Sequence, residues 1–370
     1  MSEIFALCDD LGPQKIIHLH NFQASLQAIV VVDNIAAGPS IGGVRMAPDV
    51  TLAECAGLAR AMTLKNAAAG LQHGGGKAVI SADPAMPAAA KQALMRAFSQ
   101  AIMQIEDYIP GPDMGTNETC MGWVADEIGR AVGLPRVLGG IPLDEIGATG
   151  FGLAAAAEVA LDYCDLDLEG ARVAVQGFGA VGQNAARFLT EKGANLVAVS
   201  DSHGSLVDAG GLPLAELREL KSAGESVTAL TGGKVLPDPT AVIGVDCDIL
   251  IPAARPGAIH ARNVDSIKAR LILEGANIPA SAEIEVQLHN RRVLVVPDFI
   301  ANAGGVICAS IEYHGGSEAQ AMQTIAGKIR HNTRVVLEVM RENRVPPRQA
   351  ALDIAHSRVR DAMAMRRNFV

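Results

Sequence analysis

The sequence predicts an α/β fold with two domains, and three observations support this prediction. The chain has 370 residues, of which 49% are apolar and 19% are charged, as in a globular protein long enough for two domains. Short apolar runs over residues 15–33 end in a turn-rich segment, which indicates a small sheet at the start. After residue 150, helical patterns alternate with nearly continuous apolar strands, which indicates a parallel sheet covered on both faces.

The first part of the chain alternates between strand and helix patterns. After the opening strands, an Ala/Leu/Met-rich stretch predicts a helix that stops at Gly70. The glycine-rich stretch before Lys77 leads into a strand-like AVISA segment. Further helices are expected before the turn-rich YIPGPDMGTN segment and after it. The three predicted helices cover residues 52–69, 87–106 and 120–132.

The second part predicts a helix over about 150–162, followed by a repeated strand-and-helix order. The strands are read from the segments ARVAVQGFG, NLVAVSD, DILIPAA, LILEGAN and RVLVVPD. A helical tail over 320–362 is interrupted by Pro346 and Pro347. We expect a substrate domain over residues 1–145, joined by C-terminal helices over 320–370, and a doubly wound domain over 146–319. The active site is expected in the cleft between them.

Composition and charge exclude several classes of function. The chain has 31 Lys and Arg against 40 Asp and Glu, a net charge of −9, so it lacks a basic surface for nucleic acid. It has no apolar stretch of about 18 residues that would span a membrane, and its acidic start is unlike a signal peptide. These features predict a cytoplasmic protein. The six scattered cysteines indicate neither a metal site nor a disulfide framework.

A glycine-rich turn between a strand and a helix predicts a dinucleotide site of the Rossmann type. Gly177 would make the tight turn, Gly179 would let the main chain approach a pyrophosphate, and Gly182 would let helix and strand pack closely. The free N–H groups of the helix N-terminus would bind the phosphates. The predicted turn is Gly177, Phe178, Gly179, Ala180, Val181 and Gly182.

Asp201, at the end of the next predicted strand, strengthens this prediction and bears on the cofactor. Its carboxylate could accept hydrogen bonds from a ribose hydroxyl and would repel a 2′-phosphate, which favours NAD over NADP. Small polar neighbours can accommodate a phosphate, so Ser202 and His203 leave NADP open.

Two lysines and one aspartate form a candidate catalytic group in the first domain. Lys65 lies in the first predicted helix, where a lysine can also simply extend to solvent, and Lys77 follows three glycines. The glycines would leave space for a ligand beside Lys77, and two close lysines in a desolvated cleft would lower each other's pKa. Asp113 lies in a Pro/Gly-rich turn, where an aspartate is either a capping residue or a catalytic carboxylate.

Several long motifs in a fixed order give the chain a family resemblance. They are GGVRMAP (42–48), MTLKNAAAGL (62–71), GGGK (74–77), GPDMGTN (111–117), GATGFG (147–152), VQGFGAVG (175–182), EGANIPA (274–280) and VVPDFIANAGGV (295–306). Together they resemble the Glu/Leu/Phe/Val dehydrogenase family of amino-acid dehydrogenases, over about residues 15–360. The resemblance implies the two-domain architecture described above and a homo-oligomer.

The resemblance also implies roles for individual residues. Lys65 would pair with the substrate α-carboxylate, Lys77 would activate water against the imino acid carbon, and Asp113 would move a proton to and from the substrate nitrogen. The reaction would convert an amino acid to a 2-oxo acid and ammonia by hydride transfer to the nicotinamide, followed by imine hydrolysis. The remaining implied contacts are Asn277, Gly42 and Gly43 with the substrate, and Thr149, Ala253 and Asn277 with the cofactor.

Two pocket positions favour an apolar substrate side chain. Glutamate enzymes of the family hold a second carboxylate with Lys and Ser, where this chain has Ile41 and Ala309. An unpaired buried carboxylate would cost several kcal/mol. Gly111 is small enough to admit a larger side chain, so leucine, valine and phenylalanine are not ranked.

Two alternatives remain open. Glutamate dehydrogenase is one, because the GPDMGTN, VSDSHG and EGANIPA segments look closer to the glutamate branch of the family. The other is a non-catalytic protein that senses a nucleotide, which would have no reason to retain Lys65, Lys77 and Asp113 together.

Overall fold

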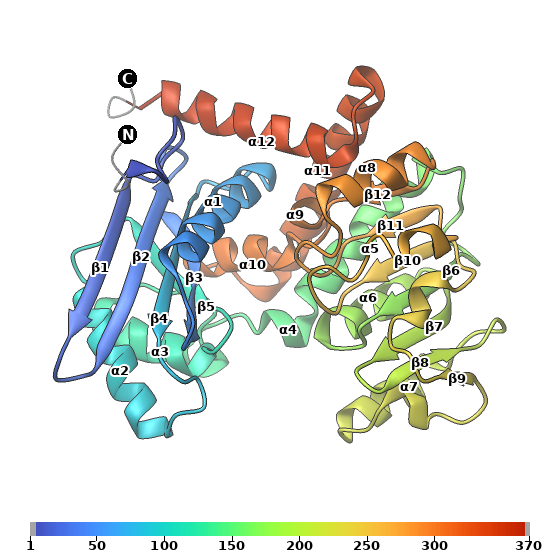
Figure 1. Ribbon diagram of the computed structural model, residues 1–370, viewed down its shortest axis with the longest axis horizontal. Helices are drawn as coiled ribbons and strands as arrows, with labels where there is room; N and C mark the ends of the chain where they lie inside the picture. The colour runs from blue at the N-terminus through green and yellow to red at the C-terminus, as the bar shows by residue number, and fades with distance from the viewer. Residues whose placement is uncertain (1–4, 367–370) are drawn as a thin grey trace. The chain divides into compact units, whose positions relative to one another are not determined.

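The computed structural model describes residues 5–366, and its contacts divide the chain into two compact units (Figure 1). Unit 1 runs to Pro142 and also includes Val306–Ala321 and the chain from Ile354 onward. Unit 2 consists of Leu143–Gly305 and Met322–Asp353. The outermost residues of the predicted first domain, 1–4 and 367–370, lie outside the described part of the chain.

Unit 1 is built on a small mixed sheet, as the sequence predicted, and its five strands have the order β1-β2-β4-β3-β5. β2 pairs antiparallel with β1 and β4, whereas β3 pairs parallel with both β4 and β5. Its core lies between the sheet and two of its helices, α2 and α3, and includes Phe98 and Tyr108. The elements are β1 (Lys15–Asn21), β2 (Leu26–Asn34), β3 (Ser40–Ala47), α1 (Leu52–Ala68), β4 (Gly74–Ser81), α2 (Ala88–Ala101), β5 (Tyr108–Pro112) and α3 (Glu118–Ile128).

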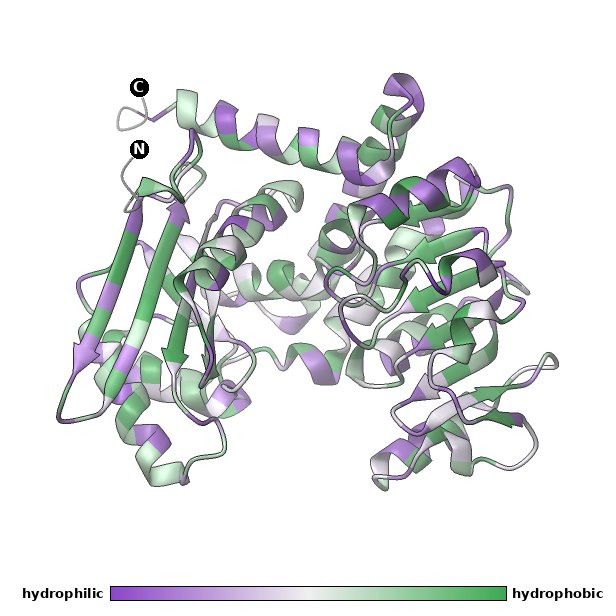
Figure 2. Ribbon diagram, viewed as in Figure 1, coloured by the Kyte–Doolittle hydropathy of each residue, from purple (hydrophilic) through white to green (hydrophobic). Residues whose placement is uncertain are grey.

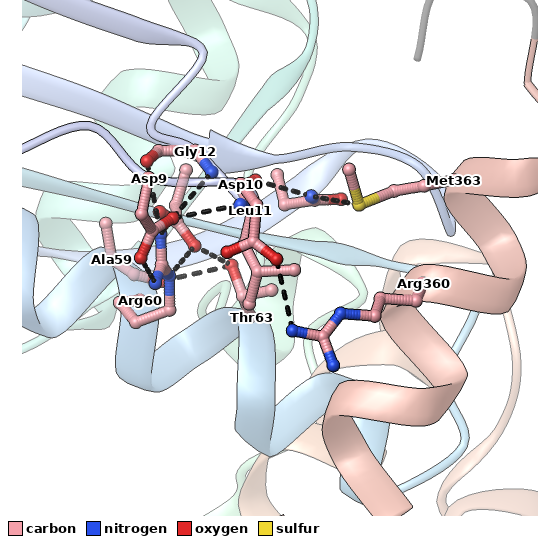
Figure 3. Close-up of polar contacts among 11 residues, drawn as sticks. Asp9, Asp10, Leu11, Gly12, Ala59, Arg60, Thr63, Arg360 and Met363 are labelled. Carbon is pink, nitrogen blue, oxygen red and sulfur yellow. Dashed lines mark hydrogen bonds and ion pairs between the residues drawn. The ribbon is translucent and has the colours of Figure 1, made fainter. Parts of the chain in front are cut away.

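Helix α1 starts where its sequence predicts and is held in place by polar contacts. The side chain of Thr51 accepts a hydrogen bond from the N–H of Glu54 at 3.1 Å, which caps the helix N-terminus. On the buried side of the helix, Arg60 binds both oxygens of Asp9 at 2.7 Å and Asp33 at 2.8 Å (Figure 3). This bidentate ion pair between Arg60 and Asp9 holds the N-terminal segment against α1. Arg360 adds a contact with Asp10 at 3.1 Å.

Unit 2 contains a seven-stranded sheet in the order β12-β11-β10-β6-β7-β8-β9. The first five of these strands are parallel, as predicted, and Figure 2 shows their hydrophobic character. The antiparallel strands β8 and β9 were not predicted, because they are short and polar at one end. The strands are β6 (Arg172–Gln176), β7 (Asn195–Asp201), β8 (Gly204–Val207), β9 (Lys234–Leu236), β10 (Ile249–Pro252), β11 (Leu271–Leu273) and β12 (Leu294–Val296).

Helices flank this sheet and connect its strands. The α-helices are α4 (Leu143–Ile146), α5 (Ala148–Ala160), α6 (Ala180–Thr190), α7 (Leu214–Ser222), α8 (Ala282–Asn290) and α9 (Asp298–Ala301). Short 3₁₀ turns in the chain are η2 (Arg136–Leu138), η3 (Leu161–Tyr163), η4 (Val227–Ala229), η5 (Ala241–Gly244) and η6 (Val264–Ser266). No helix among residues 5–366 is both long and apolar enough to cross a bilayer.

The C-terminal helices are shared between the units, whereas the sequence placed all of residues 320–370 with the first domain. They are α10 (Gly304–Tyr313), α11 (Glu318–Asn343) and α12 (Pro347–Ala364). α11 packs within unit 2, because Arg330 pairs with Glu158 at 2.5 Å and Arg341 lies 4.5 Å from the Tyr163 ring centre. The end of α12 packs within unit 1, where Arg358 donates to two carbonyl groups at the end of α1.

Candidate active site

Three neighbouring strands of unit 1 bring the predicted catalytic residues together. β3 lies between β4, which carries Lys77, and β5, which ends immediately before Asp113. The Lys77 ammonium is hydrogen bonded to Oδ2 of Asp113. The side chain of Lys77 is 7% exposed and that of Asp113 is 23% exposed, so the pair is buried on the lysine side and reachable on the aspartate side.

The predicted glycines on β3 allow this pair to form. A Cβ at Gly43 would lie 2.7 Å from the Cβ of Asp113 and 3.2 Å from Nζ of Lys77. Gly42 packs against the carbonyl of Gly76, and its own carbonyl accepts a hydrogen bond from the Tyr108 hydroxyl at 2.9 Å. Gly43 therefore makes room for the ion pair, whereas Gly42 lets two strands approach.

The triple glycine before Lys77 has a role different from the one that we expected. Its residues belong to β4, so the strand begins at Gly74 and not after Lys77. A Cβ at Gly74 would overlap the backbone of Asn34, and one at Gly75 would overlap the backbone of Thr63. The glycines are buried and allow close backbone packing; they do not open space for a ligand beside Lys77.

A tight turn fixes the position of Asp113. The N–H of Asp113 donates to Oγ1 of Thr116 at 3.0 Å, and the Thr116 hydroxyl is 2.8 Å from the carbonyl of Val44. Gly115 has a φ of +82° and packs against Met46, so a side chain there would be strained and would clash. The turn is anchored to β3, and the carboxylate of Asp113 is directed at cationic side chains.

Arg45 is a member of this group that sequence reasoning missed. Its Nε donates to Oδ2 of Asp113 at 3.2 Å, and its Nη1 donates to Glu54 at 2.5 Å. Burial would raise the pKa of Asp113, but Lys77, the backbone N–H of Met114 and Arg45 more than offset this effect and keep the pKa below its ordinary value. Arg45 is the arginine of the GGVRMAP motif, and this motif could have indicated that Arg45 belongs to the site.

Lys65 lies on α1, which packs against β4. Its neighbours Thr63 and Asn66 are buried against the strand, and Asn66 donates to the carbonyl of Gly74 at 2.7 Å. Lys65 itself is half-buried.

The predicted pocket residues Ile41 and Ala309 share one apolar cluster of unit 1. The cluster also contains Ile109 and Val132, which the sequence analysis missed, and Ala309 is its partly buried member. Gly111 adjoins it, because a Cβ there would lie 3.1 Å from Cγ2 of Val132. All four side chains of the cluster are uncharged and apolar.

In unit 2, the predicted glycine turn connects β6 to α6. Gly177 has a φ of +92°, and a Cβ at Gly182 would lie 2.9 Å from Cγ1 of Val175, so both positions require glycine. A Cβ at Gly179 would meet no atom within 4 Å, which leaves the backbone there open to a ligand. Gly179 also precedes α6 without a side-chain cap, so the helix N-terminus can receive a phosphate.

A pocket of about 500 Å³ lies beside this turn. Its walls include six of the predicted cofactor residues, namely Gly177, Phe178, Gly179, Asp201, Ser202 and Ala253. The other lining residues are Gln176, Ser200, Lys221, Pro239, Thr240, Ala254 and Arg255. The predicted residues Ala180, Val181 and Gly182 lie in the first turn of α6. The turn, the helix end and the pocket fit a dinucleotide.

Asp201 has four hydrogen-bond donors within the protein. The N–H groups of His203 and Val227 donate at 3.0 and 2.9 Å, the Ser226 hydroxyl at 2.9 Å and the Lys221 ammonium at 3.0 Å. Burial raises the pKa of Asp201, but these donors outweigh burial and bring the pKa to about 2. Only 8% of the side chain is exposed.

The remaining predicted residues lie elsewhere in unit 2. Thr149 is half-buried in the first turn of α5. Asn277 is exposed, and its Oδ1 accepts a hydrogen bond from Asn302 at 3.1 Å. The next residue, Ile278, has a φ of +47° and donates its N–H to Asp298 at 2.9 Å.

Asp298 belongs to a buried ionic cluster that sequence reasoning also missed. Arg348 contacts Glu274 and Asp298 at 2.9 Å and Glu285 at 2.6 Å. Burial raises the pKa of Glu274 well above its usual range and that of Glu285 to about 7. One guanidinium faces three carboxylates, so the cluster retains a proton at moderately acidic pH.

Two models of one protein family match this chain. Residues 139–367 match the model described as Glutamate/Leucine/Phenylalanine/Valine dehydrogenase, and residues 18–130 match the dimerisation domain of the same family. The chain belongs to the Glu/Leu/Phe/Val dehydrogenase family. The resemblance read from the motifs is confirmed, as is the α/β fold with a Rossmann-type domain. The protein is an amino-acid dehydrogenase that acts on CH–NH₂ donors with NAD(P).

Individual relatives come from different branches of the family. A glutamate dehydrogenase of Aeropyrum pernix is 38% identical over 90% of this chain and 85% of its own length. The hetero-hexameric glutamate dehydrogenase of Thermus thermophilus, in a leucine-bound form, has a TM-score of 0.84 and 29% identity, and the match covers 97% and 91% of the two chains. L-tryptophan dehydrogenase of Nostoc punctiforme has a TM-score of 0.76 and 26% identity, with 97% and 99% covered. Other relatives include NADP-dependent and NAD-specific glutamate dehydrogenases.

Proposed function

We propose that the protein catalyses the reversible NAD-dependent oxidative deamination of an L-amino acid with an apolar side chain, of the leucine, valine or phenylalanine class. The products are the 2-oxo acid and ammonia. The apolar cluster supports this substrate class, because Ile41 and Ala309 lie together with Ile109 and Val132 and offer no charge to a second carboxylate. Gly111 lies beside Val132, and a Cβ there would lie 3.1 Å from Cγ2 of Val132, so a side chain at this position would narrow the space for a branched or aromatic substrate.

In this proposal, Lys77 and Asp113 carry out the proton transfers. The nicotinamide, when bound, supplies the acceptor for the hydride that leaves the substrate Cα. Asp113 is ionised in the free protein because its pKa is low, and it accepts the proton of the substrate nitrogen once Lys77 has turned to the substrate. Lys77 orients the water that adds to the imino acid carbon, and Asp113 returns the proton to the departing ammonia.

The proposed contacts with substrate and cofactor are those that the family resemblance implies. Lys65 on α1 pairs with the α-carboxylate, assisted by the exposed amide of Asn277. Thr149 and Asn277 contact the nicotinamide end of the cofactor. The glycine turn from Gly177 receives the pyrophosphate, where backbone N–H groups and the helix dipole favour an anion.

Glutamate is the second candidate substrate. The curated relatives named above are mostly glutamate dehydrogenases, and the first of them matches 90% of this chain. For glutamate to be the substrate, a cation outside the apolar cluster would have to pair with its γ-carboxylate.

A substrate panel tests the proposal. The purified protein is mixed with NAD and, separately, with L-leucine, L-valine, L-phenylalanine and L-glutamate, and reduced nicotinamide is followed by absorbance. Oxidation of the apolar amino acids and not of glutamate is expected. Turnover with glutamate alone would contradict the proposed apolar substrate, while the assignment as an amino-acid dehydrogenase would stand.

A lysine variant separates an enzyme from a nucleotide sensor. Lys77→Ala should abolish turnover while NADH still binds, as measured by its fluorescence. Turnover retained in this variant would remove Lys77 from the mechanism. Lys91→Ala is the control, because Lys91 is a surface lysine that donates to the carbonyl of Pro84.

We also propose a homo-oligomer located in the cytoplasm. β1 forms one edge of the sheet in unit 1, where a second copy could pair, and the matching family domain is described as a dimerisation domain. All six cysteines are free thiols, as is usual in a reducing compartment. Light scattering of the purified protein should give a mass that is a multiple of 38.4 kDa.

A further inference from the structure

We propose that Asp298 and Arg348 are positioning residues for the reaction, because they hold the loop that presents Asn277 to the substrate and the cofactor. This loop, the Asn277 loop, covers residues 274–280 between β11 and α8 in unit 2. The inference rests on the proposed function, because it takes Asn277 as a residue that binds both ligands. Only 8% of the Asp298 side chain and 16% of the Arg348 side chain are exposed, so both act through the loop.

The Asn277 loop turns at Ile278 through a backbone conformation that favours glycine. Ile278 has a φ of +47°, and a β-branched residue keeps such an angle only where its surroundings enforce it. Ile278 is 57% exposed, so the packing of its side chain contributes little to holding this angle. The backbone contacts of Ile278 must therefore hold the turn.

Two hydrogen bonds hold the backbone of Ile278. Its carbonyl accepts from the N–H of Gly257 at 2.9 Å, and its N–H donates to Oδ2 of Asp298 at 2.9 Å. The N–H of Asp298 in turn donates at 2.9 Å to Oε2 of Glu274, the first residue of the loop. Asp298 thus joins the turn of the loop to its start.

Arg348 sets the orientation of the Asp298 carboxylate. Its Nη2 donates to Oδ1 of Asp298 and to Oε2 of Glu274, each at 2.9 Å. The guanidinium holds its donors in fixed directions, so Oδ1 is bound on one side and Oδ2 stays directed at the loop. Glu285 on α8 accepts from Nε of the same guanidinium at 2.6 Å. Within residues 5–366, no hydrogen bond joins the Glu285 carboxylate to residues 275–280.

The position of Asn277 depends on the bond that Asp298 makes. The N–H that Asp298 binds belongs to the peptide group between Asn277 and Ile278, so a rotation of this group would displace the Asn277 side chain. Oδ1 of Asn277 accepts a hydrogen bond from Asn302 at 3.1 Å. The amide NH₂ of Asn277 is therefore the group that can donate to an α-carboxylate or a ribose hydroxyl. A displacement of about 1 Å at such a group can lower a rate about a hundredfold.

Steady-state kinetics on variants of the full chain test the inference. Asp298→Asn should lower kcat/KM for the preferred amino acid of the panel by about 10- to 100-fold, because an amide has one oxygen and cannot accept from both Arg348 and Ile278 as the carboxylate does. Glu285→Gln is the matched control, since it removes the same charge from the same guanidinium and should leave kcat/KM unchanged. Urea unfolding of each variant separates an effect on the reaction from a loss of stability.

The substitution Asn277→Ala shows whether Asp298 acts through Asn277. Residues that act through one contact have non-additive effects, so Asp298→Asn should lower kcat/KM by less than about threefold in the Asn277→Ala background. If Asp298→Asn does not fold, Arg348→Lys takes its place in the same double-mutant cycle. Lysine keeps the charge but lacks the fixed fork of donors, so the same non-additive loss is expected.

The possible outcomes separate the inference from the proposed function. Full activity of Asp298→Asn, or a loss that adds to that of Asn277→Ala, would overturn the inference and leave the proposed function intact. An equal loss of kcat/KM in Glu285→Gln would also overturn it, because the charge of the cluster and not the contact with the loop would then matter. An undiminished kcat/KM in Asn277→Ala would remove Asn277 from the proposed function, and the inference with it.

Discussion

Asp113 and Asp201 occupy comparable places in two different sheets, and their surroundings differ in kind. Asp113 directly follows β5 in unit 1, and Asp201 is the last residue of β7 in unit 2. The pKa of each carboxyl lies below its ordinary value. The side-chain partners of Asp113 are the cations Lys77 and Arg45, beside one backbone N–H, whereas Asp201 is held by two backbone N–H groups and two side chains.

The difference shows that a carboxylate at a strand end is not by itself a binding residue. Long cationic side chains such as Lys77 can turn from Asp113 to a ligand, and 23% of the Asp113 side chain is exposed. Backbone donors cannot move without disturbing the loop, and only 8% of Asp201 is exposed. We therefore expect substitutions of Asp113 to affect the reaction and substitutions of Asp201 to affect mainly stability.

The largest expected effect is on the reaction. Asp113→Asn should lower kcat by about 10²- to 10⁴-fold, because an amide cannot exchange the proton that a carboxylate carries. Circular dichroism and the thermal midpoint should show an intact fold. An unchanged kcat would mean that Asp113, like Asp201, has only a structural role.

A third group of carboxylates, around Arg348, should show the largest effect on stability. Arg348→Met leaves Glu274, Glu285 and Asp298 buried without a cation and should cost about 3–5 kcal/mol of unfolding free energy. Adding Glu285→Gln removes one of the uncompensated charges and should restore part of this loss in urea unfolding. An additive effect of the two substitutions would mean that the groups do not interact.

Asp201→Asn should reduce stability by an intermediate amount. The amide keeps the shape but loses the charge that binds Lys221 and two backbone N–H groups, which should cost about 2 kcal/mol. NADH affinity should change less than threefold. A loss of NADH binding above tenfold, with stability unchanged, would show that Asp201 binds the ribose after all.

The stabilising effect of Asp201 should depend on pH in a defined direction. Its pKa in the folded protein, about 2, lies below the ordinary value of 3.8, so its contribution is fully present above about pH 4. This contribution is lost as the pH falls from 4 toward 2. The difference in urea stability between the unchanged protein and Asp201→Asn should therefore be constant near pH 6 and shrink near pH 3.

The smallest expected effect concerns substrate choice on the Asp113 side. Gly111→Ala places a methyl group 3.1 Å from Val132 and should lower kcat/KM for phenylalanine about tenfold more than for valine, a difference of about 1 kcal/mol. The panel of amino acids measures the ratio. An equal loss for both would place Gly111 outside the side-chain pocket.

Local patterns predicted much of the fold and part of the site. The strands and helices and the glycine turn at Gly177 follow from periodicity and from motifs that are continuous in the chain. Lys77 and Asp113 were candidates from their motifs, but their ion pair was not predicted, because β3 joins the two strands that carry them only in the folded sheet. The cluster of Arg348 with Glu274, Glu285 and Asp298 could not be predicted, since its members lie in separate elements and meet only after folding. The same is true of three of the four donors around Asp201, which lie 20 to 26 residues further along the chain, on α7 and in the segment that follows it.

The glycine run of β4 has a consequence for protein engineering. Gly74, Gly75 and Gly76 are confined by neighbouring backbone and by Ser40, so almost every replacement there should fail at the level of folding. The members of the apolar cluster contact one another through side chains and differ mainly in volume. A mutational library aimed at new substrates should keep the glycine codons constant and randomise the codons of Ile41, Ile109, Val132 and Ala309.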